Sequence, residues 1–578
     1  MTDPEAALGA LVLQALADEL GPEYSAADPL IRPSGFADYQ SNVAMSLSRQ
    51  LGRPPRDIAA PVAARLAAAS AVASAEVSGP GFINITLADE WIAAEASDQL
   101  ADARLGVTQA DPSQLVVVDY SGPNVAKELH AGHLRPTVVG DAIARTLEHL
   151  GYRVLRAAHL GDWGTQFGML IEHALDIGER ETEDELASGE FTAFYQAARA
   201  EFDADPAFVE RSRRRVVSLQ GGDEESLRIW RMLVSESMVY LRRLYQRLNV
   251  TLSTDADMDP ESFYNPMLAE VCDELESKAI ATISDGALCV FPPGFTGRDE
   301  KPLPLILRKS DGGYGYATTD IAAIRYRICD LGAQRMIYVV GADQRLHLAM
   351  VFATARLAGW LTDKISAEHA VIGLVTGADG QRLRTRTGEQ VKLASLMDEA
   401  VERAEQVIAD RYPDAAERDQ IAEAVGIGAL KYADLSVARD SSYALDFDRM
   451  LALSGNTGPY LQYATARIRS IFRRAGLDAD GAITAPIQVT EEAERAVALR
   501  LLGFGAVVGQ VAKTTEPHRL CVYLFELASA FTTFYEKCPV LQADSSAVRD
   551  SRLALSGLTL RVLLTGLDLL GVPVPDRM

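Results

Sequence analysis

The chain has 578 residues, of which 48% are hydrophobic and 24% are charged, and its formal net charge is −24 at pH 7. That length predicts roughly three or four domains, and the composition is typical of a soluble globular protein and excludes a low-complexity chain. Because the negative phosphates of a nucleic acid are repelled by negatively charged side chains, this charge excludes a nucleic-acid partner that binds non-specifically over the whole surface. A polyanion would have to bind selected faces.

Candidate basic faces exist, although each by itself reads more readily as a solvated helix face. They are Arg211, Arg213, Arg214 and Arg215; Arg242 and Arg243; Arg382, Arg384 and Arg386; and Arg467, Arg469, Arg473 and Arg474.

The first residues do not read as a secretory signal. Asp3 and Glu5 stand where a signal would be basic, and Asp3 followed by Pro4 predicts the start of an amphipathic helix. No uninterrupted apolar stretch appears long enough to span a bilayer, so no membrane partner is expected. The five cysteines form no CxxC pair, which predicts reduced thiols in a cytoplasm and no zinc module or other tightly bound metal.

Residues 1 to about 110 predict a small α+β unit, in which the sequence alternates apolar and polar from Ile83 to Leu87 like a half-buried strand. The pattern of apolar and polar residues changes at residue 111. The continuous apolar run Leu115 to Tyr120 predicts a strand buried on both faces, and a helix follows from near His130 to Leu150. A second strand is expected over Tyr152 to His159, which completes a right-handed βαβ unit of a parallel sheet.

Residues from about 175 to 250 are charged and helical in pattern, and they read as an insertion into this domain. From about 400 to 578, helical periods dominate and strand signals vanish. The predicted domains are therefore 1–110, 111–399 and 400–578. Further strands are expected before residue 400, at Leu303 to Arg308, Tyr314 to Ala317, Met336 to Val340 and His369 to Leu374.

The segment His130-Ala131-Gly132-His133 lies at the predicted helix start, directly after the first strand. Ligands of open parallel sheets bind at the carboxyl ends of the strands, and a helix N-terminus attracts phosphate. Two imidazoles three residues apart can donate hydrogen bonds to an α-phosphate, and Gly132 lets a nucleotide approach the backbone. The alternative, a zinc site, lacks a third ligand at the usual spacing.

A second candidate is the loop from Gly380 to Gly388, which carries Arg382, Arg384 and Arg386 between glycines. A basic, hydroxyl-rich loop of this kind suits closure over a triphosphate and neutralisation of pyrophosphate. An exposed basic loop without such a role explains the pattern equally well.

Together the two segments resemble the HIGH and KMSKS signatures of class I aminoacyl-tRNA synthetases, and the wider sequence resembles arginyl-tRNA synthetases over nearly its whole length. The resemblance is weakest over residues 175–250. It is carried by residues 38–42 and 80–85, Ser121 to Arg135, His159 to Gly168, Lys309 to Asp320, Phe534 to Leu541 and Val572 to Met578.

This resemblance implies a Rossmann-type catalytic domain, an N-terminal α+β domain that contacts tRNA, and a C-terminal all-α anticodon-binding domain. The KMSKS element is degenerate, with Leu383 and Arg386 in place of its two lysines. The family is thought to compensate with a lysine just upstream of HIGH, which is Lys127 here. The resemblance therefore implies that Lys127, His130, His133 and Arg386 act on ATP, together with Gly132 and Arg384.

An arginine pocket should offer carboxylate and neutral acceptors in the plane of the guanidinium, which lysine could not satisfy. By resemblance, the side-chain pocket maps to Glu261, Tyr316 and Asp320, and Asn124 and Gln344 hold the amino and carboxylate end. The spacing of Tyr316 and Asp320 suits one face of a helix start. Asp320 has an alternative role as the cap of that helix. His159 and Trp163 are expected to shape the cleft rather than to react.

In the helical region, Tyr460, Tyr463 and Arg467 share a stripe that can stack on bases and bind phosphate. The alternative is a core stripe packed against neighbouring helices. Family resemblance favours an anticodon-binding role for the domain, though not for any one residue.

The expected activity is that of an arginine–tRNA ligase, which uses MgATP to form arginyl-adenylate and then esterifies the 3′ end of tRNA(Arg). By resemblance, activation depends on bound tRNA, and the enzyme is a cytoplasmic monomer. Two rivals remain. A small-molecule nucleotidyltransferase would not need the domain at 400–578, and a non-catalytic tRNA-binding paralogue could dispense with the histidines and the pocket.

Overall fold

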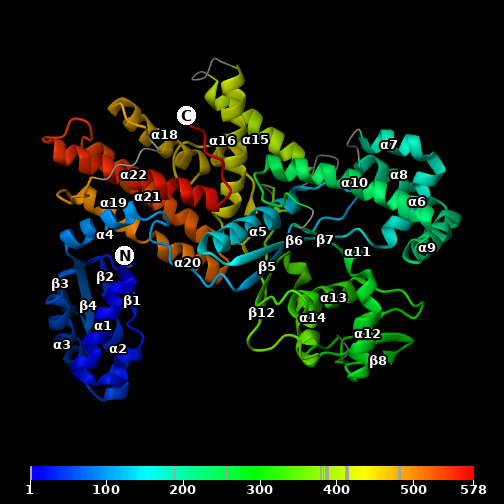
Figure 1. Cartoon of the computed structure of the whole chain (residues 1–578), viewed down its shortest axis with the longest axis horizontal. Coiled ribbons are helices and arrows are strands. Elements are labelled where there is room, and N and C mark those ends of the chain that lie inside the picture. The colour runs from blue at the N-terminus through cyan, green and yellow to red at the C-terminus, as the bar shows by residue number, and fades with distance from the viewer. Residues whose placement is uncertain are drawn as a thin grey trace.

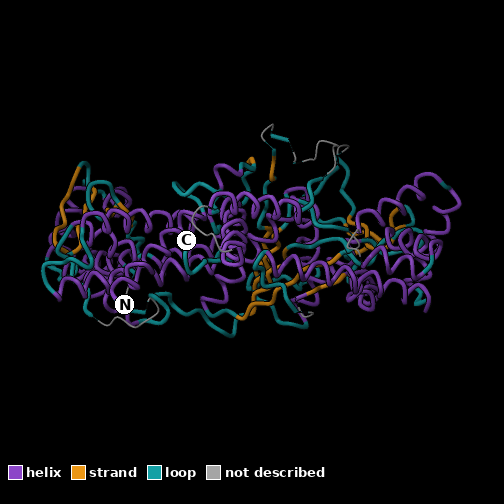
Figure 2. The backbone as a smooth tube through the Cα atoms, turned by 90° about the horizontal axis from the view of Figure 1, so that it is seen from above, coloured by secondary structure: helices purple, strands orange, loops and turns teal. Residues whose placement is uncertain are grey.

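The computed structural model describes residues 3–125, 127–187, 191–254, 257–297, 300–377, 380–381, 383, 390–409, 415–478 and 485–578. A parallel sheet lies at the centre of the molecule, with helical units on either side (Figure 1). The strands gather in the N-terminal unit and in the middle of the elongated molecule (Figure 2). The central sheet has the order β12-β11-β5-β6-β7, with β5 at Leu115–Tyr120, β6 at Arg153–Leu160, β7 at Met258–Pro260, β11 at Arg335–Val339 and β12 at Ser366–His369.

The predicted unit at the start of this sheet is confirmed. All six residues of β5 are buried, as the continuous apolar run indicates, and β5 pairs in parallel with β6. Helix α5 (Ala131–Leu150) connects the two strands and packs against both. A Cβ at Gly140 of α5 would lie 2.3 Å from atoms of the Tyr120 side chain, so a glycine is required where this helix crosses the sheet.

Two of the other predicted strands are wrong in part. Of the strand expected at Tyr314 to Ala317, Tyr314 forms an isolated bridge with Arg308, and Tyr316 opens helix α13 (Tyr316–Cys329) after the N-cap Gly315. The expected strand at His369 to Leu374 instead spans Ser366–His369, because beyond it the chain leaves the sheet and the Gly373 N–H donates to the Arg439 carbonyl oxygen.

The remaining strands form smaller sheets. β10 (Leu305–Arg308), β9 (Ala287–Val290) and β8 (Ala281–Ser284) make an antiparallel sheet, which confirms the core of the strand expected at Leu303 to Arg308. β13 (Val375–Thr376) pairs in parallel with β14 (Tyr443–Ala444). Strand structure therefore does not end at residue 400, although it is confined there to two residues in the described part of the chain.

The segment at 175–250 is helical, as predicted, and forms one end of the molecule (Figure 1). Arg211 and Arg215 of this segment pair with Glu172 and Asp176, so this basic cluster neutralises acids of a neighbouring helix. Its helices are α6 (Thr165–Ile177), α7 (Glu179–Ala187), α8 (Phe191–Ala204), α9 (Pro206–Gln220) and α10 (Glu224–Arg247).

The N-terminal unit combines four helices with an antiparallel sheet of order β1-β2-β4-β3, and the predicted strand is β4 (Phe82–Leu87) with alternating burial. Asp3 caps α1, as expected from Asp3-Pro4. Arg495 of the C-terminal region pairs with Asp38 and Asp89 and so docks the unit onto that region. The other elements are α1 (Pro4–Leu20), β1 (Ile31–Pro33), β2 (Tyr39–Ser41), α2 (Val43–Leu51), α3 (Pro55–Ala67), β3 (Val72–Ser78) and α4 (Asp89–Ala101).

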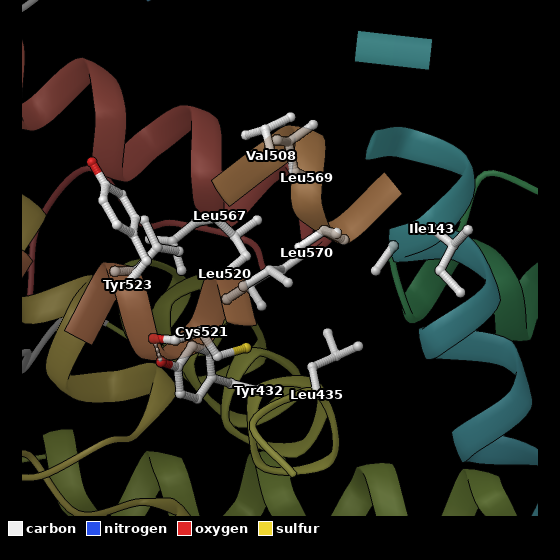
Figure 3. Packing of buried hydrophobic residues seen from close by; sticks show 14 of the residues in the cluster. Ile143, Tyr432, Leu435, Val508, Leu520, Cys521, Tyr523, Leu567, Leu569 and Leu570 are labelled. Carbon is white, nitrogen blue, oxygen red and sulfur yellow. Dashed lines mark hydrogen bonds between the residues drawn. The ribbon is translucent and has the colours of Figure 1, made fainter. Parts of the chain in front are cut away.

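Helices dominate the C-terminal region around a core that includes Leu520, Leu567 and Leu570 (Figure 3). Within it the Tyr432 hydroxyl donates to the Cys521 carbonyl oxygen at 2.9 Å. The helices are α15 (Leu393–Ile408), α16 (Ala415–Leu435), α17 (Phe447–Met450), α18 (Gly458–Ala475), α19 (Glu492–Leu502), α20 (Phe504–Thr514), α21 (His518–Lys537) and α22 (Ser546–Leu569).

One stretch, Glu492–Thr514, is long and apolar enough to cross a membrane by composition, contrary to the expectation from the sequence. It comprises α19 and α20, which pack against α4, α5, α21 and α22. Its apolar residues are accounted for by this helical core.

A buried ion pair joins α5 to α16. Arg135 and Asp434 are 1% and 0% exposed, and the Arg135 Nε lies 3.2 Å from the Asp434 Oδ1. Arg135 also donates to the carbonyl oxygens of Ala438 and Ser441, and the Tyr443 hydroxyl donates to Asp434. This cluster fixes the helix that carries the two histidines to the strand pair β13–β14.

Replacing Arg135 with Ala should destabilise the protein by about 3–5 kcal/mol, because Asp434 would stay buried without a counter-charge. Urea unfolding followed by circular dichroism measures the change. The double variant Arg135→Met with Asp434→Met is the control and should lose much less, because it leaves no uncompensated charge. Equal losses in the two variants would contradict this account.

Candidate functional site

Three of the predicted pocket residues, together with Gly161, follow four adjacent strands of the central sheet. Asn124 follows β5, Gly161 follows β6, Glu261 follows β7, and Gln344 closes the short helix η4 (Ala342–Gln344) after β11. The strands are parallel, so their carboxyl ends meet at one edge of the sheet, where ligands of such folds bind. Residues more than 200 positions apart in the sequence therefore line one site.

The two histidines of the HxGH segment form the reciprocal cap at the start of α5. His130 is the N-cap, and its Nδ1 accepts a hydrogen bond from the Gly132 N–H at 3.1 Å. The His133 Nδ1 accepts from the His130 N–H at 3.1 Å, and the two rings lie 3.9 Å apart between centroids. A neutral imidazole whose Nδ1 accepts carries its proton on Nε2, so both side chains present an Nε2–H donor.

Burial lowers the pKa of His133 to about 3, and the neighbouring His130 adds to the shift. His133 is therefore a neutral hydrogen-bond donor at physiological pH. Local packing also accounts for the glycine at position 132, because a Cβ there would lie 2.8 Å from the His130 ring. The predicted role of this glycine in nucleotide approach stays a prediction.

The segment that follows the basic loop lies against the HxGH segment. The Ala131 N–H donates to the Val391 carbonyl oxygen, the Leu393 N–H donates to the Leu129 carbonyl oxygen, and His130 and Lys392 form an antiparallel bridge. The Lys392 ammonium also lies 2.8 Å from the Glu128 carboxylate. Arg382, Arg384 and Arg386 lie outside the described residues, and Val391 to Leu393, which come after them, lie beside the histidines.

Glu261 opens the short helix α11 (Glu261–Tyr264), which is oriented by the loop after β6. Asp162 of that loop accepts hydrogen bonds from the N–H and hydroxyl of Ser262, at 2.9 and 2.6 Å. Burial raises the pKa of Glu261 to about 7, and the charge of His159 opposes the shift. Such a carboxyl group readily loses its proton and becomes negatively charged when a cation enters the pocket.

Tyr316 and Asp320 lie one turn apart on α13, as predicted. Gly315 is the N-cap of this helix, so the alternative role of Asp320 as its cap is wrong. The Asp320 Oδ2 lies 2.6 Å from the His347 Nε2, and the rings of Tyr316 and His347 lie 4.8 Å apart. His347, on helix α14 (Arg345–Leu357), was missed by the sequence analysis, although it follows Gln344 by three residues.

A buried charge cluster lies beneath the pocket. Arg327 binds the carboxylates of Asp119 and Asp259, and the His159 Nδ1 lies 3.5 Å from the Asp259 Oδ2. Burial opposes the charge on His159, but Asp259, Asp320 and Asp119 outweigh it and raise the pKa of His159 to about 9. Asp119, His159 and Asp259 are close enough to hold a metal ion, but Arg327 already supplies the positive charge there.

Asn124 is held against the loop after β6. It forms a parallel bridge with Gly161, and a Cβ at Gly161 would lie 2.4 Å from the Asn124 Oδ1. A side chain at position 161 would therefore displace the Asn124 amide. Trp163, two residues on, packs edge to face on Trp230 at 5.5 Å, in keeping with a cleft-shaping role.

The three predicted tRNA-contacting residues on α18 are partly buried. Tyr460 packs on Phe525 at 5.8 Å, and its hydroxyl lies 3.4 Å from the Thr532 hydroxyl. Arg467 lies over the rings of Tyr463 and Tyr535, at 4.9 and 5.6 Å. Their role in RNA binding stays a prediction, and Tyr460 also contributes to helix packing.

Three family descriptions match consecutive parts of the chain. Residues 6–87 match the arginyl tRNA synthetase N terminal domain, residues 95–447 match the catalytic domain of the tRNA synthetases class I (R), and residues 461–578 match the DALR anticodon binding domain.

Whole-chain relatives agree with these matches. The chain is 59% identical over 580 residues to an arginine–tRNA ligase of Thermobifida fusca, with 100% of both chains covered. It is 51% identical to one of Frankia casuarinae, with 98% of both covered. Among solved structures, the arginyl-tRNA synthetase of Plasmodium falciparum superposes with a TM-score of 0.85 at 28% identity, and that of Thermus thermophilus with 0.80 at 25%, each over 100% of both chains.

The ionisation of Glu261 should control the binding of a guanidinium ligand. Below pH 7 the carboxyl is protonated, so the Kd for L-arginine should fall about tenfold per unit as the pH rises toward about 7, and should level off above it. His159 stays largely protonated up to about pH 8, because its pKa is about 9. Equilibrium dialysis with labelled arginine at pH 5.5 to 8.5 measures the profile.

The matched control for this profile is Glu261→Gln, which keeps the shape of the side chain without the charge. It should bind arginine weakly and with no inflection near pH 7. A wild-type Kd that does not change between pH 6 and 8 would contradict the role of Glu261.

Proposed function

The chain belongs to the arginyl-tRNA synthetase family of class I, and on that premise we propose how its residues carry out arginine–tRNA ligation. The main support for this proposal is the set of groups that lie at one edge of the sheet. They are the neutral imidazole donors at a helix start and the carboxylates of Glu261 and Asp320. The donors suit a phosphate that gains negative charge, and the carboxylates suit a guanidinium.

In the first step, the carboxylate of arginine attacks the α-phosphate of ATP, which is bound as its magnesium complex, and pyrophosphate leaves. The Nε2–H groups of His130 and His133 donate to the α-phosphate oxygens as negative charge builds on them. The N-terminal dipole of α5 acts in the same direction. No general base is required, because the attacking carboxylate is already ionised, so positioning and charge stabilisation dominate the rate.

The leaving pyrophosphate needs cations beside the two histidines. Lys127, upstream of the HxGH segment, and Arg384 and Arg386 in the basic loop are proposed to neutralise it. The bridge between His130 and Lys392, six residues after Arg386, supports this assignment. Closure of the loop over bound ATP would bring the arginines to the phosphates.

Arginine is selected by its guanidinium group, which is planar, permanently charged and forked. Glu261 and Asp320 are proposed to accept from the guanidinium with Tyr316 beside them, and Asn124 and Gln344 to hold the amino and carboxylate end. Lysine cannot satisfy such a fork, and buried acceptors left without partners support discrimination of about 10⁴ or more.

In the second step, the 3′-terminal ribose hydroxyl of tRNA(Arg) attacks the carbonyl carbon of arginyl-adenylate, the new ester bond replaces the bond to the phosphate, and AMP and the hydroxyl proton are released. The helical region from about 400 to 578 is proposed to bind the anticodon, with Tyr460, Tyr463 and Arg467 in contact with it. The unit at 1–110 is proposed to contact the outer corner of the tRNA, and residues 111–399 to form the catalytic domain.

The enzyme is proposed to act as a monomer in the cytoplasm, without a membrane partner. The five cysteines are all free, which supports a reducing compartment. One chain supplies every proposed pocket residue, which supports activity without a partner subunit.

ATP–pyrophosphate exchange with each amino acid in turn, with and without total tRNA, tests the proposed function. Exchange with arginine alone, and only when tRNA is present, is the expected result. A folded protein that still binds tRNA but exchanges nothing would instead favour the non-catalytic paralogue.

Replacing either His130 or His133 with Ala should lower the exchange rate by about 10²–10³, if each is a preorganised donor. The matched controls are His130→Asn and His133→Asn, which keep a donor and should lose less. A loss below about threefold in both alanine variants would contradict the assignment, because removal of a hydrogen-bond donor to the transition state lowers the rate by more than that.

A further inference from the structure

The helical insertion supplies an aromatic ring to the lysine upstream of the HxGH segment. The Lys127 ammonium lies 4.2 Å from the centroid of the Tyr195 ring, which belongs to α8 of the insertion. This distance falls within the range of a favourable cation–π contact. Lys127 is also close enough to His133 to lower the pKa of that imidazole, so the ring holds the ammonium near the predicted phosphate site.

The backbone is held by hydrogen bonds at Val125 before Lys127 and at Leu129 after it. The Val125 N–H donates to the Gly161 carbonyl oxygen, and the Leu129 carbonyl oxygen accepts from the Leu393 N–H. A lysine side chain is flexible and loses rotamer entropy when it is held in place. A partner that orders the side chain before ATP binds removes that loss from the binding step.

Carboxylates do not take this role in the part of the chain that the structure describes. The adjacent acid, Glu128, pairs with Lys392 at 2.8 Å, whereas the Lys127 ammonium lies over the ring of Tyr195. An ion pair would hold the ammonium in competition with the phosphates of ATP. A neutral ring attracts the cation but leaves its full charge available to an incoming anion.

We propose that Tyr195 is a positioning residue of the insertion, which orients Lys127 toward the phosphates of ATP. The proposal rests on the proposed function, because the lysine matters only if it meets ATP. It gives the insertion, where the family resemblance is weakest, a defined part in the first step of the reaction. It also adds to the proposed site a residue that lies in neither signature.

The test is arginine-dependent ATP–pyrophosphate exchange by the full chain with tRNA present. Tyr195→Leu should lower kcat/KM for ATP by about two- to thirtyfold, which corresponds to the strength of a cation–π contact. The KM for arginine should not change. Tyr195→Phe keeps the ring and should restore most of the loss.

The matched control lies on the same helix. Phe202 of α8 carries a cation–π contact with Arg199 at 5.5 Å, and Phe202→Leu should leave the kinetics of ATP unchanged. Equal thermal midpoints for Tyr195→Leu and Phe202→Leu would exclude a general loss of the insertion. In a Lys127→Met background, Tyr195→Leu should have no further effect, because the ring acts through the lysine.

The outcomes separate this inference from the proposed function. No arginine-dependent exchange by the wild type would overturn the proposed function, and full activity of Lys127→Met would overturn the role of the lysine. Wild-type behaviour of Tyr195→Leu, an equal loss in Tyr195→Phe, or an unchanged loss in the Lys127→Met background would each overturn the positioning role alone.

Discussion

The start of α5 is the feature on which the rest of the site depends, because one set of hydrogen bonds ends the loop, begins the helix and prepares the chemistry. A helix start leaves backbone N–H groups without partners. Here His130 and His133 accept two of these N–H groups through their Nδ1 atoms, and the Ala131 N–H is taken by Val391. The bonds to Nδ1 set the tautomer of both imidazoles, and the bond to Val391 attaches the segment after the basic loop to the helix that carries them.

Charges buried below and behind the site hold this arrangement in place. Arg327 joins the carboxyl groups of β5 and β7 through Asp119 and Asp259, and His159 of β6 lies against the same group. Arg135 and Asp434 join α5 to α16. Buried pairs of this kind add little net stability, but breaking one is costly, so they favour a single register between the elements that they connect. A pocket for a charged, planar ligand requires such a rigid frame, because small displacements weaken paired hydrogen bonds.

The helical insertion differs from the other parts in how it contributes. Two of its basic residues, Arg211 and Arg215, are used in pairs with Glu172 and Asp176. The insertion contacts the proposed site through the aromatic side chain of Tyr195 on α8, which lies over Lys127. An insertion can vary in sequence and still keep such a contact, since the contact requires one ring at one position and not an extended motif.

The sequence by itself determined the local features whose signals are short in range. These include the buried strand at Leu115 to Tyr120, the helix that starts at the HxGH segment, the α+β unit and the helical insertion. It also placed Tyr316 and Asp320 on one helix face, because the spacing of four is a property of the helix itself. The residues of the site could be named through the family resemblance, since the motifs recur in the family's order.

The tertiary structure alone decided the features that depend on distant partners. The strand expected at His369 to Leu374 is displaced because Gly373 meets the backbone near Ser441, some 70 residues away, and no local pattern records that contact. The partnership of Asp320 with His347, the charge state of His159 and the ring over Lys127 likewise depend on side chains brought together by the sheet and the insertion. Periodicity reports which face of an element is buried, but the identity of the group against that face is set only when the chain has folded.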